Sequence, residues 1–199
     1  MDIAGFENSG IIRVDIPNSV ISIFRWTFLG NNLIREDIPS SVVFIGEAAF
    51  ASNNLTSVDI PNSVIGIGSA VFSNNNLTSV VVPNSLTSIP RLAFANNNLT
   101  SVVIPNSVTT IGISAFESNN LTSVDIPNSV TTIGYRAFAN NNLTSVTIER
   151  NNVDICVTAF RRRGAFGNCN FISVYNGIAG TFERLNPAGN PYTWTRTSP

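Results

Sequence analysis

The chain has 199 residues, enough for one domain with a sizeable core, and 43% of them are hydrophobic while only 12% are charged. This composition excludes an intrinsically disordered chain. The formal net charge is -1 and no apolar run reaches the ~20 residues that cross a bilayer, so we expect neither nucleic-acid binding nor membrane insertion.

A 22-residue repeat runs through most of the chain. Its unit reads LTSVDIPNSVTTIGYRAF at residues 121–138, followed by an asparagine run. Units begin at Ile11, Leu33, Leu55, Leu77, Leu99, Leu121 and Leu143. Phe6 precedes Phe28 by the same step, so residues 1–10 are expected to be the tail of an earlier coil. A period of this length is typical of solenoids, in which each unit buries its apolar side against the next.

The first half of each unit predicts a strand. In the unit that starts at Leu121, Val124 and Ile126 alternate with polar residues, as in a half-buried strand. Pro127 follows directly and lacks the N–H that a strand ladder needs. We therefore expect the strand to end there and the chain to turn.

The second half of the unit predicts further inward-pointing residues. Val130 and Ile133 form a second apolar pair, and Gly134 is expected to permit a tight bend. Ala137 and Phe138 predict a small-plus-large plug of the core, carried on a 3-10 or single helical turn. In a stacked array the equivalent phenylalanines should lie in one file.

One unit position is an asparagine in nearly every coil. Asparagine offers both a donor and an acceptor, so a stacked ladder of this residue can satisfy the backbone groups of the buried turns above and below. We interpret this ladder as structural; it comprises Asn31, Asn53, Asn75, Asn97, Asn119 and Asn141.

The combination of proline, glycine and Ala-Phe at fixed offsets resembles the BspA-like class of leucine-rich repeats, which occur in bacterial surface proteins. The likeness covers residues 1–176. Asparagine replaces the ladder cysteine of that class except at Cys169. The resemblance implies a right-handed, β-rich solenoid with short strands and 3-10 turns. It also implies an extracellular or cell-surface location and a role in adhesion or protein binding.

The array is expected to become irregular near its C-terminal end. The segment 149–164 departs from the repeat, with Glu149 in place of proline and a six-residue insertion before AFGNC, which resumes the register at residues 165–169. An exposed solenoid end is an open strand edge, which charge and irregularity protect. We interpret Arg161, Arg162 and Arg163 as a solvated guard of this end; an anion-binding patch is the alternative.

The tail 177–199 is predicted to cap residues 1–176 with a β-hairpin. Its β-prone runs flank the turn-rich NPAGNP, and the hairpin would lay Phe182, Tyr192 and Trp194 across the last coil. No comparable cap precedes the first coil in this sequence. Either the array was cut from a longer protein, or its bare first coil permits end-to-end stacking of copies into a homo-oligomer.

The chain lacks the residues that most catalysis requires. Histidine is absent, and no phosphate-binding loop or paired-cysteine motif occurs, so we expect neither an enzyme nor a cofactor. The sequence leaves open whether Cys156 and Cys169 pair.

The carboxylates gather in one column, which comprises Asp15, Asp37, Asp59 and Asp125. Stacked carboxylates repel one another unless a cation or an arginine intervenes. Arg13 and Arg35 lie two residues from the first two aspartates, on the same strand face, so ion pairs are expected. Weak Ca²⁺ binding is the alternative.

Variable letters are expected on the outside of the coils. The two residues after each Ile-Gly position form a stripe of mixed chemistry, and tryptophan, tyrosine and arginine often carry interface energy. The candidate partner-binding residues are Arg25, Trp26, Glu47, Arg91, Leu92, Ile113, Tyr135 and Arg136. Neutral drift at tolerant surface positions would produce the same variety.

Three functions fit this stripe. The first is an adhesion or protein-binding module whose partner is a protein on a host or on the same cell. The second is a self-assembling, filament-forming solenoid. The third is a glycan-binding module that uses Trp26 and Tyr135.

Overall fold

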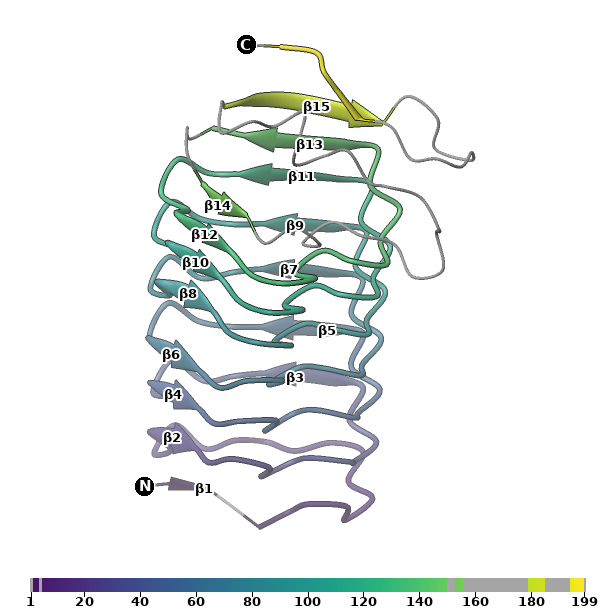
Figure 1. The fold of residues 1–199 in the computed structure, drawn as a ribbon. Helices are drawn as coiled ribbons and strands as arrows, with labels where there is room; N and C mark the ends of the chain where they lie inside the picture. The colour runs from purple at the N-terminus through teal and green to yellow at the C-terminus, as the bar shows by residue number, and fades with distance from the viewer. Residues whose placement is uncertain (1, 4, 150–152, 156–178, 185–193, 199) are drawn as a thin grey trace.

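The computed structural model describes residues 2–3, 5–149, 153–155, 179–184 and 194–198. Over these residues the chain winds into a rod of stacked coils, with the N-terminus at one end and the C-terminal strands at the other (Figure 1). All regular elements in the described ranges are strands, and none is a helix that could span a bilayer. The β-rich solenoid predicted from the repeat is confirmed.

A first strand column follows the LTSV part of the repeat. It comprises β3 (Arg35–Asp37), β5 (Ser57–Asp59), β7 (Ser79–Val81), β9 (Ser101–Val103), β11 (Ser123–Ile126) and β13 (Ser145–Ile148). Parallel ladders join β3 to β5, β7 to β9 and β11 to β13, with each residue opposite its repeat equivalent. In β11 the residues alternate between exposed and buried, and the strand ends directly before Pro127. Both predictions for this part of the unit are confirmed.

A second strand column lies beside the first (Figure 1). It comprises β1 (Asp2–Ile3), β2 (Ser22–Ile23), β4 (Phe44–Ile45), β6 (Gly66–Ile67), β8 (Ser88–Ile89), β10 (Thr110–Ile111), β12 (Thr132–Ile133) and β14 (Asp154–Ile155). These strands form two parallel sheets, β1-β2-β4-β6 and β8-β10-β12-β14. Val130 and Ile133 are buried as predicted, but the pattern did not predict a strand here.

The core is built around a file of stacked rings. Six phenylalanines of this file are fully buried: Phe28, Phe50, Phe72, Phe94, Phe116 and Phe138. Phe6 stacks on the first of them, and neighbouring ring centroids lie 5.2–5.7 Å apart along the file. Offset aromatic pairs at this distance are favourable beyond the area they bury. The single file expected from the repeat is confirmed.

The chain turns twice between the second strand column and the phenylalanine. In the coil of Phe50, Ala49 N–H donates to the Gly46 carbonyl at 3.3 Å and Ala51 N–H to the Ala48 carbonyl at 3.1 Å. Ala48 has a φ of 50°, the left-handed conformation that a type II turn requires at its third position. Two linked β-turns therefore stand where the sequence predicted a 3-10 or single helical turn, because the left-handed residue interrupts helical winding.

Gly134 has a different role from the bend expected of it. Its φ does not lie in the left-handed region. A Cβ atom at this position would lie 2.7 Å from the Ile113 nitrogen and 2.8 Å from the Gly112 carbonyl carbon of the preceding coil. Glycine is therefore required because successive coils approach closely here.

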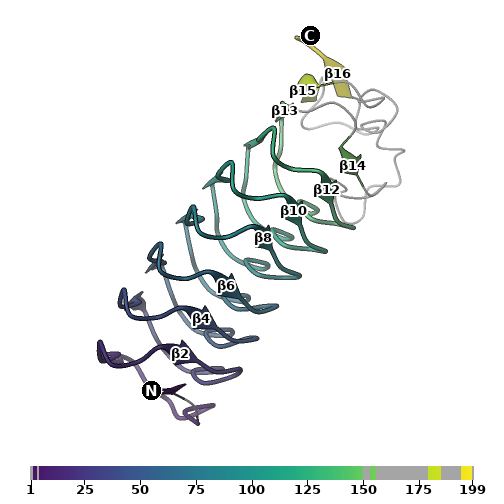
Figure 2. The same cartoon turned by 90° about the vertical axis from the view of Figure 1, so that its left-hand side faces the viewer.

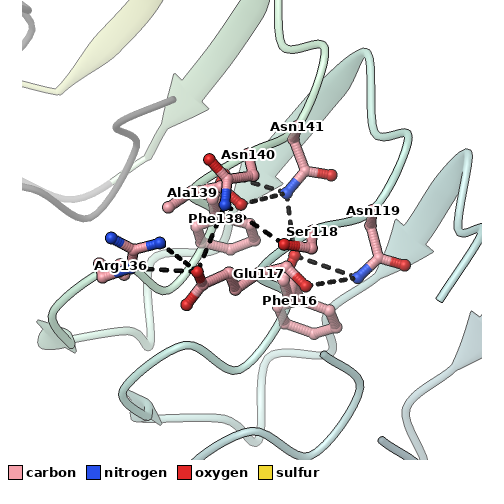
Figure 3. A network of polar contacts seen from close by, with 9 residues as sticks. All are labelled: Phe116, Glu117, Ser118, Asn119, Arg136, Phe138, Ala139, Asn140 and Asn141. Atoms are coloured by element: carbon pink, nitrogen blue, oxygen red, sulfur yellow. Dashed lines mark hydrogen bonds and ion pairs between the residues drawn. The ribbon is translucent and has the colours of Figure 1, made fainter. Parts of the chain in front are cut away.

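The asparagine ladder closes the turns, as Asn97 illustrates. Its Nδ2 donates to the carbonyl oxygens of Phe72 at 2.9 Å, Phe94 at 3.1 Å and Ala95 at 3.3 Å. Its Oδ1 accepts a hydrogen bond from Leu77 N–H at 3.0 Å. Each ladder residue thus serves its own coil and the coil before it, and Figure 3 shows two more members, Asn119 and Asn141. The structural ladder is confirmed at the asparagines; Cys169 lies outside the described residues.

The C-terminal hairpin is confirmed as a strand cap. β15 (Gly180–Arg184) pairs antiparallel with β13, and β16 (Trp194–Arg196) pairs antiparallel with β15. Phe182 is fully buried and belongs to the core cluster. The expected positions of Tyr192 and of the Trp194 side chain lie outside what the structure describes.

The repeat persists further than the sequence analysis expected. β14 pairs with β12 so that Ile155 lies opposite Ile133, which keeps the 22-residue step. The departure predicted for all of 149–164 therefore does not include residues 153–155. The arginine guard at 161–163 and the resumed register at 165–174 lie outside the described residues.

Removing one rung of the ladder should destabilise the rod. Asn97→Ala leaves the Leu77 N–H and several carbonyls without their partner, so we expect a loss of about 2–4 kcal/mol of unfolding free energy. Urea denaturation followed by circular dichroism measures this change. The matched control is Asn98→Ala, which changes an exposed neighbour and should stay within about 0.5 kcal/mol of the parent chain. Equal losses in both variants would contradict the ladder's structural role.

Candidate binding surface

The structure places the predicted stripe on the outside of the turns. At the first position of the variable pair the residues are exposed in five coils: Arg25, Glu47, Arg91, Ile113 and Tyr135. Ser69, the equivalent of these residues, is half-buried. Side chains of different chemistry thus follow one another along the rod, as the variable letters predicted.

The second position of the pair is constrained by the backbone. Trp26, Leu92 and Arg136 belong to a column of six residues with φ between 50° and 62°. Leu92 N–H donates to the Ile113 carbonyl of the next coil at 3.0 Å, and Trp26 N–H donates to Glu47 in the same way. A residue other than glycine pays about 1 kcal/mol for this conformation, which the bonds between coils stabilise. We call these residues the left-handed column.

Neighbouring charges reduce the freedom of several stripe residues. The guanidinium carbon of Arg25 lies 4.9 Å from the ring centroid of Trp26, within the range of a cation–π contact. Arg136 forms an ion pair with Glu117 of the preceding coil, and its Nε lies 3.1 Å from Glu117 Oε1 (Figure 3). This hydrogen bond raises the pKa of Arg136 above its usual range. Arg136 therefore joins two coils, whereas Arg91 is exposed.

The aspartate column carries the expected ion pairs. The Nη2 atom of Arg13 lies 3.0 Å from Asp15 Oδ1, and the Nη2 atom of Arg35 lies 3.1 Å from Asp37 Oδ1. All four side chains are strongly exposed, so these pairs contribute little to stability. Within the described ranges, no three or more acidic, cysteine or histidine side chains are grouped so as to hold a metal ion.

An apolar patch on the first three coils was missed by the sequence analysis. Ile21, Phe24, Phe44 and Ile65 are 45%, 47%, 52% and 55% exposed, and all lie on or beside the second strand column, which faces the viewer in Figure 2. We call these four residues the apolar patch. The equivalents of Ile65 in the next coils are Thr87, Thr109 and Thr131. The change from isoleucine to threonine along this column is visible in the sequence. It lies outside the variable pair from which the binding residues were predicted.

A hollow of about 520 Å³ lies within this region. Phe24, Phe44, Gly66, Gly68 and Arg25 contribute to its wall. The Phe44 ring lies against Gly66, where a Cβ atom would be 2.6 Å from Phe44 Cε1. The hollow therefore connects the apolar patch with the start of the predicted stripe, since Phe24 and Phe44 of the patch and Arg25 of the stripe all line it.

A second residue missed by the sequence analysis is Glu36. It occupies the inward position of β3 and is only 3% exposed, whereas valine holds the same position in the coils before and after it, at Val14 and Val58. Burial, followed by the charges of Asp37 and Asp15, raises the pKa of Glu36 from 4.5 to about 8. The carboxyl group is therefore neutral at pH 7.

The repeat and the fold have known counterparts. A profile of the BspA type leucine rich repeat region matches residues 3–99 and 43–173, in six copies. Together the two matches span more than half of the chain. A search of curated proteins found no match.

Several solved structures are similar to the chain. A leucine-rich repeat protein from Bacteroides ovatus ATCC 8483 is 28% identical with a TM-score of 0.63, covering 78% of this chain and 40% of that one. A leucine rich cell surface protein from Faecalibacterium prausnitzii A2-165 is 27% identical with a TM-score of 0.53, covering 66% of this chain and 43% of that one. The chain thus spans less than half the length of either structure.

Glu36 should make the stability of the rod depend on pH. Ionisation is disfavoured in the folded chain but not in the unfolded chain, so the unfolding free energy should fall as the pH rises from 4.5 to about 8. Glu36→Val introduces the residue of the neighbouring coils and should remove this pH dependence of the unfolding free energy. We expect its melting temperature at pH 8 to exceed that of the parent by on the order of 5 °C. Calorimetric melts between pH 4 and 9 measure the effect, and parallel curves for both proteins would refute it.

Proposed function

Because the chain belongs to the family of BspA type leucine-rich repeat proteins, we propose that it is a non-enzymatic protein-binding or adhesion module. It engages a protein partner through outward-facing residues of its first three coils. The partner's contact surface is apolar at its centre, to match the apolar patch, and polar at its edge, to match the charged residues of the stripe.

One observation carries this proposal: exposed apolar side chains are concentrated at one end of a surface whose other end is hydroxylated. Ile65 is 55% exposed, while its equivalents are threonines in the following coils. Soluble proteins rarely expose a contiguous apolar patch unless something covers it. Since the core and the turns do not require Phe44 or Ile65 to be apolar, an external partner supplies the reason.

The stripe provides the polar rim of the proposed interface. Arg25 lines the hollow, Trp26 follows it in the chain, and Glu47 lies one coil later. Arginine and tryptophan are enriched among the residues that dominate binding energy, and a hydrated polar rim around an apolar centre is the usual anatomy of an interface. Arg91, Tyr135 and the rest of the stripe extend the rim along the rod.

We place this module on a bacterial cell surface or outside the cell. The support is the F. prausnitzii relative, which is described as a leucine rich cell surface protein. The non-enzymatic role fits a sequence without histidine, the commonest general base.

The test replaces two residues of the apolar patch with threonine, the residue that later coils carry at the equivalent positions. The double variant Phe44→Thr/Ile65→Thr copies the threonines of the fifth coil, Thr110 and Thr109, and should keep the fold. Fluorescently labelled chain is applied to cultured epithelial cells and to intact bacteria, and bound protein is quantified by flow cytometry. We expect the double variant to bind at least tenfold more weakly than the parent, since its apolar anchors are lost.

Three controls separate the candidate functions. Thr109→Ala/Thr110→Ala changes the equivalent positions of the fifth coil, two coils after Ile65 and three after Phe44, and should bind like the parent. Protease treatment of the cells should abolish binding; loss on periodate oxidation alone would favour the glycan alternative. Concentration-dependent light scattering by rods would favour self-assembly. If the double variant binds normally while Trp26→Ala/Arg91→Ala/Tyr135→Ala does not, the stripe and not the patch is the interface.

A further inference from the structure

Glu36 is the one acidic side chain among the buried residues of the described ranges. It sits in the inward column that is otherwise filled by valine, at positions 14, 58, 80, 102, 124 and 146. Its Oε2 is fully buried and has no hydrogen-bond partner. A buried polar atom without a partner is costly, so its retention calls for a ligand or a function.

A hollow lies beside Glu36, whose Oε2 itself is closed off from solvent. A cavity of about 500 Å³ lies between residues 12–16 of the first coil and residues 34–37 of the second. Its wall includes consecutive residues of both segments, of which Glu36 is buried while Ile12 and Ile34 are exposed. The cavity therefore passes between the two segments and does not merely lie on one face.

The backbone of the two segments is also open at this place. Residues 12–16 form no ladder with β3, although β3 pairs fully with β5 on its other side. The last backbone bond between the two coils before the cavity joins Asn32 N–H to the Ile11 carbonyl. Carbonyl groups beside the cavity are thus available to accept hydrogen bonds from a bound group.

The charges around the cavity leave the carboxyl of Glu36 as the unbalanced group. Arg13 pairs with Asp15 on the first coil, and Arg35 pairs with Asp37 on β3 itself. On β5, packed on the other side of β3, Asp59 is exposed and lies opposite Asp37. The two arginine–aspartate pairs cancel, so the cavity can take up one positive charge once the Glu36 carboxyl has lost its proton.

We propose that this cavity binds a linear alkylammonium group, with the ammonium at Glu36 and the aliphatic chain against Ile12, Ile16 and Ile34. An ammonium has three donors, which the Glu36 carboxylate and the neighbouring carbonyls accept. A divalent cation is a poorer match, since Ca²⁺ needs six to eight oxygen ligands and the described residues contain no acidic group of that kind. The same chemistry occurs in free alkylamines and in the lysine side chain of a peptide.

Binding is coupled to the release of one proton. The alkylammonium ion arrives charged, because amines of this type have a pKa near 10. The neutral Glu36 carboxyl then loses its proton to solvent and forms an ion pair with the ligand. With the pKa of Glu36 at about 8, affinity should rise about tenfold per pH unit from pH 6 to 8 and level off above it.

The experiment is an NMR titration of isoleucine methyl groups with n-pentylamine at pH 6, 7, 8 and 9. We expect saturable shifts at Ile12, Ile16 and Ile34, with the stated pH dependence. n-Pentanol, which has the same chain length without the charge, should bind at least tenfold more weakly. Nα-acetyl-lysine amide is titrated in parallel: binding of both amines assigns the site to lysine side chains as well, and binding of pentylamine alone assigns it to free amines.

Glu36→Gln should weaken pentylamine binding at pH 8 at least tenfold and abolish its pH dependence. Glu36→Val, which copies the neighbouring coils, provides a second variant whose fold is checked by circular dichroism. The matched control Asp125→Asn removes an exposed carboxylate of the same strand column, far from the cavity, and should leave binding unchanged. Absence of saturable shifts at pH 8, shifts located elsewhere, or unchanged affinity in both Glu36 variants would overturn the proposal.

Discussion

The molecule depends on one constraint, which is that each coil must satisfy its buried backbone through its neighbour. Every turn hides carbonyl and N–H groups beside the stacked phenylalanines, and the asparagine of the next coil reaches back to them. Asn97 alone accepts from Leu77 and donates to Phe72 in the coil before it. Stacking of apolar side chains supplies the driving force, but these bonds fix the spacing and the register at which it operates.

The predictable parts of the fold are those in which one residue type has one structural role. Phenylalanine fills the core, asparagine closes the turn and proline ends the strand, so their 22-residue columns revealed the solenoid. The second strand column was not predicted because two-residue strands such as Thr132–Ile133 are too short to show alternation. Gly134 was assigned to a bend because sequence does not distinguish a left-handed residue from one pressed against the preceding coil.

The candidate surface was predictable only in part, for a related reason. The first residue of the variable pair lies on the outside of the turns, as Arg25 and Tyr135 show, whereas the second is half-buried at Leu92 and Arg136 and buried at Ser114. The apolar patch escaped because isoleucine at position 65 reads as another core residue unless it is compared with the threonines that follow it. Glu36 escaped because a single letter interrupts a valine column, and only its burial and the cavity beside it reveal that the interruption has consequences.

The left-handed column has an implication for how such proteins diversify. Residues at this position must tolerate positive φ, which β-branched side chains do poorly, and the described chain has none of them there. The preceding position carries no such requirement and holds arginine, glutamate, serine, isoleucine and tyrosine. Duplication of a 22-residue unit followed by point mutation can therefore generate new recognition chemistry at one position per coil. At the adjacent position, only mutations to residues that tolerate positive φ are compatible with the fold.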